Sequence, residues 1–178
     1  IIELEYGFLN AVGLENPGIE GMCDIIKILK GNSVDFIVSI AGKNEKEFVL
    51  LAEKAYECGA KIVELNLSCP HAHGLGLEIG SDPFLVRKIV REIKSSTRVK
   101  VLAKLGFLSN IMEIAKTAEL AGADGLVLIN TIRGMKIDPW IRKPILSNKF
   151  GGLSGPAIHP IAVATVYRIY DIVDIPII

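Results

Sequence analysis

Residues 61–70, KIVELNLSCP, place an apolar run rich in β-branched residues directly before an amide, a thiol and a proline. The part 61–67 predicts a buried strand, because apolar residues covered on both faces are typical of parallel sheets. Asn66 comes at the end of this strand, Cys69 follows it closely, and Pro70 stops the strand and helps to fix the direction of the thiol. An amide that can recognise an imide or flavin edge, beside a thiol that can move a proton, favours a redox site for a small flat heterocycle.

Outward from this strand, apolar runs alternate with amphipathic stretches, which is the pattern of βα units around a parallel sheet. Strands are expected at 35–41, 61–67, 99–105, 124–130 and, beginning near the end of the chain, 174–178. Four helices are expected. The first runs from an Asn44 cap, where Glu47 completes a capping box, to Gly59. The others lie at 83–95, from a Ser109 cap to Gly122, and at 157–172.

Polar residues at the strand ends distinguish two parallel-sheet architectures. Ser39, Asn66, Lys104 and Asn130 each lie at or near the carboxyl end of a successive strand. In a (β/α)8 barrel these ends converge on one mouth, whereas an open sheet spreads them along a crevice. The sequence therefore predicts an α/β fold, a (β/α)8 TIM barrel forming one domain over 1–178. Five strands cannot close a barrel of eight, so we expect the domain to be truncated at both ends.

Composition narrows the function. The 178 residues are 50% hydrophobic with a formal net charge of zero, which allows one sizeable core and argues against a nucleic-acid surface. No apolar run reaches ~18 residues, so no membrane span is expected. No secretory signal is expected either, because Glu3 and Glu5 follow Ile1 and Ile2 at once. The odd cysteine count predicts reduced thiols in the cytosol, with Cys23 and Cys58 as small buried apolar residues in helical patterns.

Several longer motifs, in order along the chain, resemble dihydroorotate dehydrogenase of the cytosolic, cysteine-base class. The matching segments are 9–18, 66–70, 74–83, 129–131 with 134–135, 143–146 and 151–158. The segments KPIL and GGLSGP resemble the NAD-linked subclass, whose catalytic subunit pairs with an iron–sulfur flavoprotein. On this resemblance the chain would span strands three to seven of the barrel. A lysine that touches flavin and substrate, and the turn and last strand that hold the FMN phosphate, would lie outside it.

The resemblance implies FMN-dependent oxidation of dihydroorotate to orotate in pyrimidine biosynthesis. Cys69 would be the base that takes the C5 proton while hydride leaves C6 for flavin N5, since a thiol with a reference pKa of ~8.5 suits proton transfer near neutral pH. Asn66 and Asn130 would present amides to the imide edge of the pyrimidine, with Asn66 also reaching the flavin. The substrate pocket would be completed by Thr131 and by Asn10, Ala11, Val12, Gly13 and Leu14, the backbone N–H groups of 11–14 holding the carboxylate.

The cofactor site implied by the resemblance uses other strand ends. Lys104 would place positive charge near flavin N1 and O2 and so stabilise the anionic reduced ring, although such a lysine can also simply reach solvent. Ser39 would lie against the isoalloxazine ring, at a position where related proteins carry asparagine. Ile129 and Gly155 would contact FMN through backbone or close packing.

The loop after the cysteine departs from the family. His71 stands where many relatives carry a substrate-binding asparagine, and with His73 it forms a His-x-His pair. No third ligand is nearby in the sequence, so no metal is expected. The loop 71–80 is expected to act as a lid that carries Cys69 over the substrate.

Three alternatives stay open. The pyrimidine-reducing domain of dihydropyrimidine dehydrogenase shares the flavin barrel, the cysteine and the Cys-Pro-His sequence, and would act on uracil or thymine. The tRNA-dihydrouridine synthases also combine a flavin barrel with a catalytic cysteine, but they need a basic RNA-binding face. The chain as it stands could also be inactive, because an open barrel exposes sheet edges and core.

For the favoured function we expect dihydroorotate and orotate as ligands, FMN as cofactor and the cytoplasm as location. A homodimer and an iron–sulfur/FAD subunit that passes electrons to NAD are the expected protein partners, with fumarate as the next acceptor. Neither nucleic acid nor membrane is expected as a partner.

Overall fold

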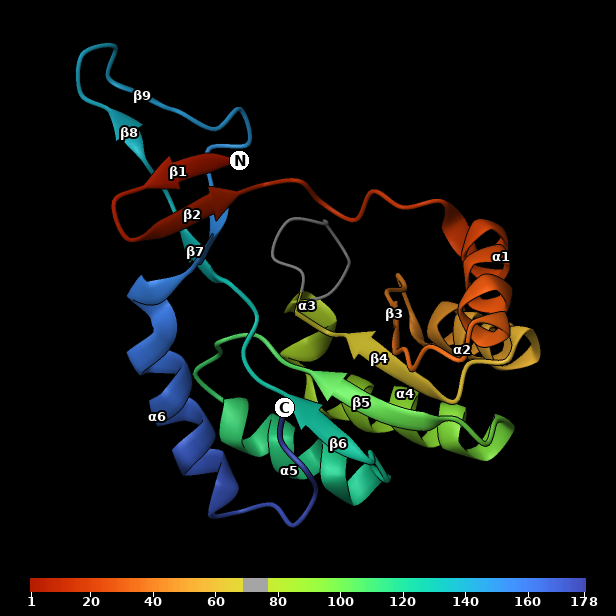
Figure 1. Cartoon of the computed structure of the whole chain (residues 1–178). Helices are drawn as coiled ribbons and strands as arrows, with labels where there is room; N and C mark the ends of the chain where they lie inside the picture. The colour runs from red at the N-terminus through yellow and green to blue at the C-terminus, as the bar shows by residue number, and fades with distance from the viewer. Residues whose placement is uncertain (69–76) are drawn as a thin grey trace.

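The computed structural model of the chain describes residues 1–68 and 77–178 (Figure 1). Its centre is a parallel sheet in the order β3-β4-β5-β6, formed by Val38–Ile40, Ile62–Asn66, Lys100–Lys104 and Gly125–Val127. Leu126 also pairs in parallel with Ile177, so the last residues run beside β6. The predicted α/β class and the positions of the predicted strands are confirmed, the fifth strand as a single β-bridge.

The helices follow the strands in chain order. They are α1 (Gly18–Gly31), α2 (Glu45–Cys58), the short α3 (Leu77–Gly80), α4 (Pro83–Ser96), α5 (Ile111–Ala121) and α6 (His159–Tyr170), the last preceded by the 3-10 turn Pro156–Ile158. Helix α1 packs on α2, α2 on α4, α4 on α5 and α5 on α6. In a doubly wound sheet the order of strands would reverse at a switch point. Here the parallel strands and the helices packed on them both follow the chain order, and Figure 1 shows α2, α4 and α5 along one side of the sheet.

The two faces of the parallel sheet differ in polarity. Val63, Leu65, Val101 and Ala103 alternate along β4 and β5, and all four are fully buried under the helix layer. The side chains at the alternate positions point to the other face. They include Ser39, which is exposed, and Glu64 and Lys104, which are partly buried. A sheet with one apolar and one polar face therefore separates the core from the functional side chains.

Helix termini explain where the sequence predicted the helices well and where it did not. In α2, Asn44 Oδ1 accepts a hydrogen bond from the N–H of Glu47 at 3.0 Å, and Gly59 ends the helix with a φ of 106°. Glu47 Oε2 in turn accepts from the N–H of Lys43 at 2.6 Å, one residue before the expected partner. The predicted Ser109 cap of α5 is wrong. Asn110 precedes the helix without capping it, because its side chain donates to the carbonyl of Ser81 at 3.0 Å.

A second, antiparallel sheet was not predicted. Its order is β1-β2-β10-β7, formed by Ile2–Leu4, Gly7–Asn10, Gly151–Ser154 and Ile132–Gly134, and the ribbon β8-β9 pairs Ile137–Asp138 with Lys143–Pro144. These strands are short and pair residues far apart in the chain, such as Leu9 with Leu153, so they leave no periodic signal. Figure 1 shows this sheet on the side toward which the arrows of β4, β5 and β6 point.

The prediction of reduced thiols is wrong for two of the cysteines. Cys23 of α1 and Cys58 of α2 form a disulfide, with their Cα atoms 5.4 Å apart. Both cysteines lie in helices, as expected, but sequence spacing could not show that α1 packs along α2 and brings the two side chains into bonding range. Within the described ranges, no helix has the length and apolar character needed to cross a membrane.

Candidate functional site

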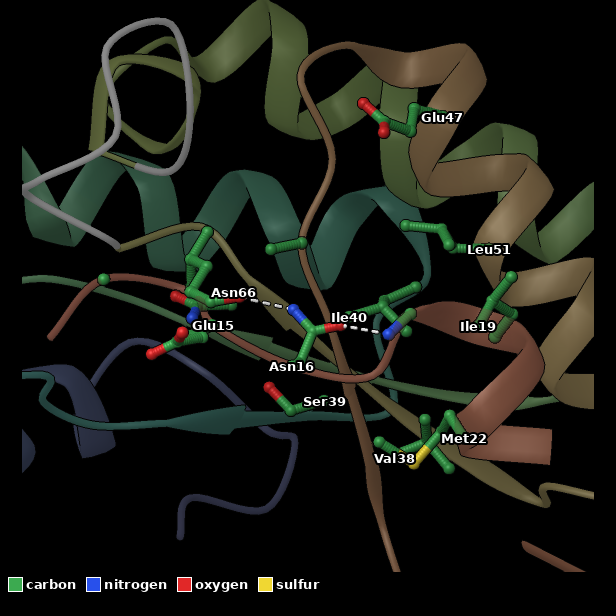
Figure 2. Close-up of a pocket in the computed structure, with 14 residues that line it drawn as sticks. Glu15, Asn16, Ile19, Met22, Val38, Ser39, Ile40, Glu47, Leu51 and Asn66 are labelled. Carbon is green, nitrogen blue, oxygen red and sulfur yellow. Dashed lines mark hydrogen bonds between the residues drawn. The ribbon is translucent and has the colours of Figure 1, made fainter. Parts of the chain in front are cut away.

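A cavity of about 450 Å³ opens where β3 and β4 end, beneath the segment that leads into α1 (Figure 2). Four of the predicted site residues line it: Gly13, Leu14, Ser39 and Asn66. Carboxyl ends of parallel strands are the usual location of ligand sites in α/β proteins. The structure therefore brings the predicted substrate segment and the predicted cofactor side chain of β3 to one place.

Asn16, which the sequence did not single out, holds the segment above this cavity. Its Nδ2 donates to the carbonyl of Leu14, and its Oδ1 accepts from the N–H of Gly18 at 2.8 Å (dashed in Figure 2). Gly13 takes a φ of 85°, a conformation that favours glycine. Together these features fix the turn that carries the backbone N–H groups expected to hold a carboxylate.

The two predicted substrate asparagines are joined through Ser68. Asn66 Oδ1 accepts from the hydroxyl of Ser68 at 3.1 Å and from its backbone N–H at 3.3 Å. Asn130 Nδ2 donates to Ser68 Oγ at 2.8 Å and to the Ser68 carbonyl at 3.4 Å. Asn130 Oδ1 accepts from the N–H of Thr131 at 2.8 Å, which brings a third predicted residue into the same network. Ser68 is only 1% exposed and was not predicted to take part.

A second network lies on the polar face of the sheet. Glu64 Oε1 accepts a hydrogen bond from Ser39 Oγ at 2.8 Å and pairs with Lys104 Nζ at 3.4 Å. Ser39 and Glu64 are directly opposite each other in the β3–β4 register. The side chains of Glu64 and Lys104 are 13% and 29% exposed, so this pair is partly shielded from water. The carboxylate of Glu64 thus connects two of the predicted cofactor residues, Ser39 and Lys104.

Two of the remaining predicted residues lie in or directly after the antiparallel sheet: Asn10 ends β2, and Gly155 follows β10. Asn10 Nδ2 donates to the carbonyl of Gly152 at 3.3 Å, so this amide stabilises the pairing of β2 with β10. Gly155 has a φ of 101°, and a Cβ atom built on it would lie 2.8 Å from the Cα atom of Gly7. A close approach within the sheet is therefore one reason for glycine at 155, whatever else lies near it.

Three further predicted residues lie away from these networks. Ile129 is partly buried against the hydrophobic core. Ala11 and Val12 continue from β2 toward Gly13, and Val12 is 55% exposed. Neither Ala11 nor Val12 is among the residues that line the cavity.

Cys69, His71 and His73 lie outside the described residues, as does most of the loop 71–80. Within residues 1–68 and 77–178, no three His, Cys, Asp or Glu side chains gather closely enough to hold a metal ion. Ser68, the described residue directly before Cys69, is buried and hydrogen-bonded to Asn66 and Asn130.

The site belongs to an α/β protein with a chain-ordered parallel sheet, and it combines a cavity, two linked amides and a partly shielded lysine at the strand ends, where α/β proteins usually bind small ligands. A model of the dihydroorotate dehydrogenase family matches residues 1–178, and the chain belongs to this family. The resemblance stated from the motifs is thereby confirmed.

Individual relatives agree with the family. The catalytic subunit of dihydroorotate dehydrogenase B (NAD(+)) from Thermoplasma volcanium is 53% identical over 169 residues, which are 93% of this chain and 56% of the relative. The protein of the same name from Pyrococcus abyssi is 48% identical over 181 residues, 100% of this chain and 59% of the relative. An Aeropyrum pernix relative, 48% identical over 165 residues (92% and 54%), is provisionally named dihydroorotate dehydrogenase A (fumarate). The chain thus spans less than two thirds of the length of these curated relatives.

Proposed function

We propose that the protein to which this chain belongs oxidises dihydroorotate to orotate in de novo pyrimidine biosynthesis, with FMN as cofactor. The family match over the whole chain supports this proposal. The observation that carries it is the Asn66–Ser68–Asn130 network, which links the amide at the end of β4 to an amide just after β6, directly before the proposed base. Paired amides of this kind suit a planar ring with carbonyl and N–H groups on its edge.

The proposed architecture is a (β/α)8 barrel of which this chain supplies strands three to seven. The chain-ordered sheet and the single layer of helices in the same order support it. In a barrel the polar face with Ser39, Glu64 and Lys104 would line the lumen near its mouth. This arrangement explains why one face of the sheet carries charged groups while the other is wholly apolar.

The residues present fit a flavin. The partly shielded ammonium of Lys104 suits a ring that becomes anionic on reduction, and Ser39 and Asn66 offer a hydroxyl and an amide at the cavity. The residues proposed to hold FMN are Ser39, Asn66, Lys104, Ile129 and Gly155. When bound, FMN supplies the acceptor for the hydride that leaves the substrate.

The chain's own residues have separate roles in the proposed mechanism. Cys69 removes the proton from C5, and Pro70 limits the directions that its backbone can take. Asn66, Asn130 and Thr131 orient the pyrimidine. The backbone N–H groups of 11–14 bind the carboxylate, on a segment that Asn16 holds in its turn.

The proposed partners follow from the relatives. Two of them are named catalytic subunits of an NAD(+)-linked enzyme, which supports a separate electron-transfer subunit with iron–sulfur and FAD centres, and NAD as final acceptor. The fumarate name of the Aeropyrum pernix relative supports the second acceptor. A homodimer and a cytoplasmic location complete the proposal.

Anaerobic stopped-flow bleaching of the bound flavin by dihydroorotate tests the proposed function in the whole protein. Cys69→Ser should slow bleaching by about 10²-fold or more at neutral pH, because an alcohol is a far poorer base than a thiol. Cys69→Ala should do the same, and both variants should keep their flavin. A wild-type flavin that dihydroorotate does not bleach, or bleaching by Cys69→Ser at the wild-type rate, would remove the proposal. A parallel assay of uracil reduction by NAD(P)H distinguishes the proposed activity from that of a dihydropyrimidine dehydrogenase.

A further inference from the structure

The orientation of both asparagine amides is determined by backbone donors. The N–H of Ser68 points at Asn66 and the N–H of Thr131 points at Asn130, at 3.3 and 2.8 Å. A backbone N–H can only donate, so each contact must be made by the amide oxygen of the asparagine. The nitrogen of each amide therefore lies at its other end.

The hydroxyl of Ser68 completes a directed chain between the two amides. It accepts from Asn130 Nδ2 at 2.8 Å and donates to Asn66 Oδ1 at 3.1 Å. The reverse direction is excluded, because an amide nitrogen cannot accept and an amide oxygen cannot donate. Since Ser68 is only 1% exposed, solvent does not compete for these bonds, and successive bonds in such a chain strengthen one another.

The two amides therefore differ in the hydrogen-bonding group that each has left for a ligand. Both acceptor sites of Asn66 Oδ1 are taken by Ser68, so Asn66, which lines the cavity, has only its N–H donors left. Asn130 gives its N–H groups to Ser68 Oγ and to the Ser68 carbonyl, so what remains is one acceptor site on Oδ1. From the residues alone each amide was expected to offer both kinds of group. The network makes Asn66 a donor and Asn130 an acceptor.

We infer that Ser68 is a positioning residue that sets this polarity, so that the site selects a ligand edge with a carbonyl oxygen next to a ring N–H. The carbonyl accepts from Asn66, and the N–H donates to Asn130. An imide edge of a pyrimidine dione carries this pair of groups. The inference rests on the proposed function and assigns to each amide its part in recognising the substrate.

Binding of orotate and of 3-methylorotate, which lacks the imide N–H, tests the inference in the whole protein. The wild type should bind orotate at least about tenfold more tightly, the equivalent of one lost hydrogen bond. Ser68→Ala should weaken the binding of orotate by about tenfold and the binding of 3-methylorotate little. The ratio of the two affinities should therefore fall toward one. Ser68→Thr, which keeps the hydroxyl, should restore the ratio. A ratio that Ser68→Ala leaves unchanged would overturn the inference.

A second pair of variants avoids changing the buried serine. Asn66→Asp and Asn130→Asp add the same charge and nearly the same shape, so repulsion of the orotate carboxylate affects both. Asn66→Asp removes the ligand-facing donors of Asn66. Asn130→Asp keeps the ligand-facing acceptor but loses the two N–H groups that Asn130 gives to Ser68. We therefore expect orotate binding to be about threefold or more weaker for Asn66→Asp than for Asn130→Asp. Equal losses, or the opposite order, would contradict the assigned polarity. A wild type that binds no orotate would instead refute the proposed function.

Discussion

Lys104 and Glu64 form an ion pair across the neighbouring parallel strands β5 and β4, with 3.4 Å between Nζ and Oε1. The same oxygen accepts a hydrogen bond from the hydroxyl of Ser39 in β3 at 2.8 Å, so one carboxylate links three neighbouring strands. Glu64 was not among the residues predicted to act in the site. Its position indicates that it limits both the direction and the effective charge of the lysine.

Glu64→Gln should therefore strengthen binding of FMN and make its reduction midpoint potential more positive. The glutamine keeps the size and the acceptor for Ser39 but no longer neutralises Lys104, and an exposed or partly exposed pair is worth up to about 1 kcal/mol, or roughly fivefold in affinity. Fluorescence titration of the apoprotein and spectroelectrochemistry would measure the two effects. Glu113→Gln, an exposed change of the same charge on α5, is the matched control. Identical values for the two variants would show that Glu64 does not act on the cofactor.

Gly80→Ala should destabilise the protein by about 2 kcal/mol or more, because overpacking against backbone cannot relax by a rotamer change. A Cβ atom at Gly80 would collide with the carbonyl of Leu67, directly before Ser68. Gly31→Ala is the control, since it lies in helix α1 with no atom within 4 Å of its Cβ position and should be neutral or slightly stabilising. Urea denaturation measures both changes. Equal stabilities would mean that α3 can move away from β4 at little cost.

Reduction of the Cys23–Cys58 disulfide should lower the free energy of unfolding by about 3 kcal/mol, because the bridge closes a loop with a sequence separation of 35. Melting with and without a phosphine reductant measures this. The variant carrying both Cys23→Ser and Cys58→Ser should melt like the reduced wild type and be insensitive to reductant. Thiol titration of the denatured protein should find two more free thiols after reduction than before it, and the variant should show no such gain. The same number of free thiols before and after reduction would contradict the bridge.

Glu119 should make stability depend on acid pH. Its carboxylate is bonded to Lys116 Nζ and to the N–H of Asp174, and these contacts lower the pKa of the Glu119 carboxyl below 4.5. Because the pKa of Glu119 is lower in the folded state, its contribution to the free energy of unfolding is fully present above about pH 4.5, the ordinary pKa of this carboxyl. The contribution is lost as the pH falls through the folded-state pKa.

Glu119→Gln should accordingly lower the melting temperature at pH 7. The loss of unfolding free energy should be less than about 1 kcal/mol, as for other partly exposed ion pairs. The difference from the wild type should shrink as the pH falls below 4.5, the ordinary value of this carboxyl. Thermal melting of the wild type and the variant over a pH series measures this, with Glu113→Gln as the control. A difference that stays constant down to acid pH would show that Glu119 does not titrate in this range.

The parallel half of the fold could be predicted because its signals are local. Apolar runs mark the strands, and Asn44 and Gly59 mark the two ends of α2 within one turn. The antiparallel sheet could not be predicted, because Leu9 pairs with Leu153 and neither strand is long enough to show a period. The cap of α5 was misplaced because Asn110 bonds to Ser81 on another segment.

The sequence by itself determined the order of the parallel strands and of the four helices predicted with them, the strand ends that carry Ser39, Asn66, Lys104 and Asn130, and the family. These depend on residue type and spacing, which are readable along the chain. Only the tertiary structure decided that Ser68 joins Asn66 to Asn130 and that Glu64 joins Ser39 to Lys104. The partners in these contacts are tens of residues apart or turned toward each other by the backbone. Their hydrogen-bond directions become fixed only when neighbouring strands place donors and acceptors within about 3 Å.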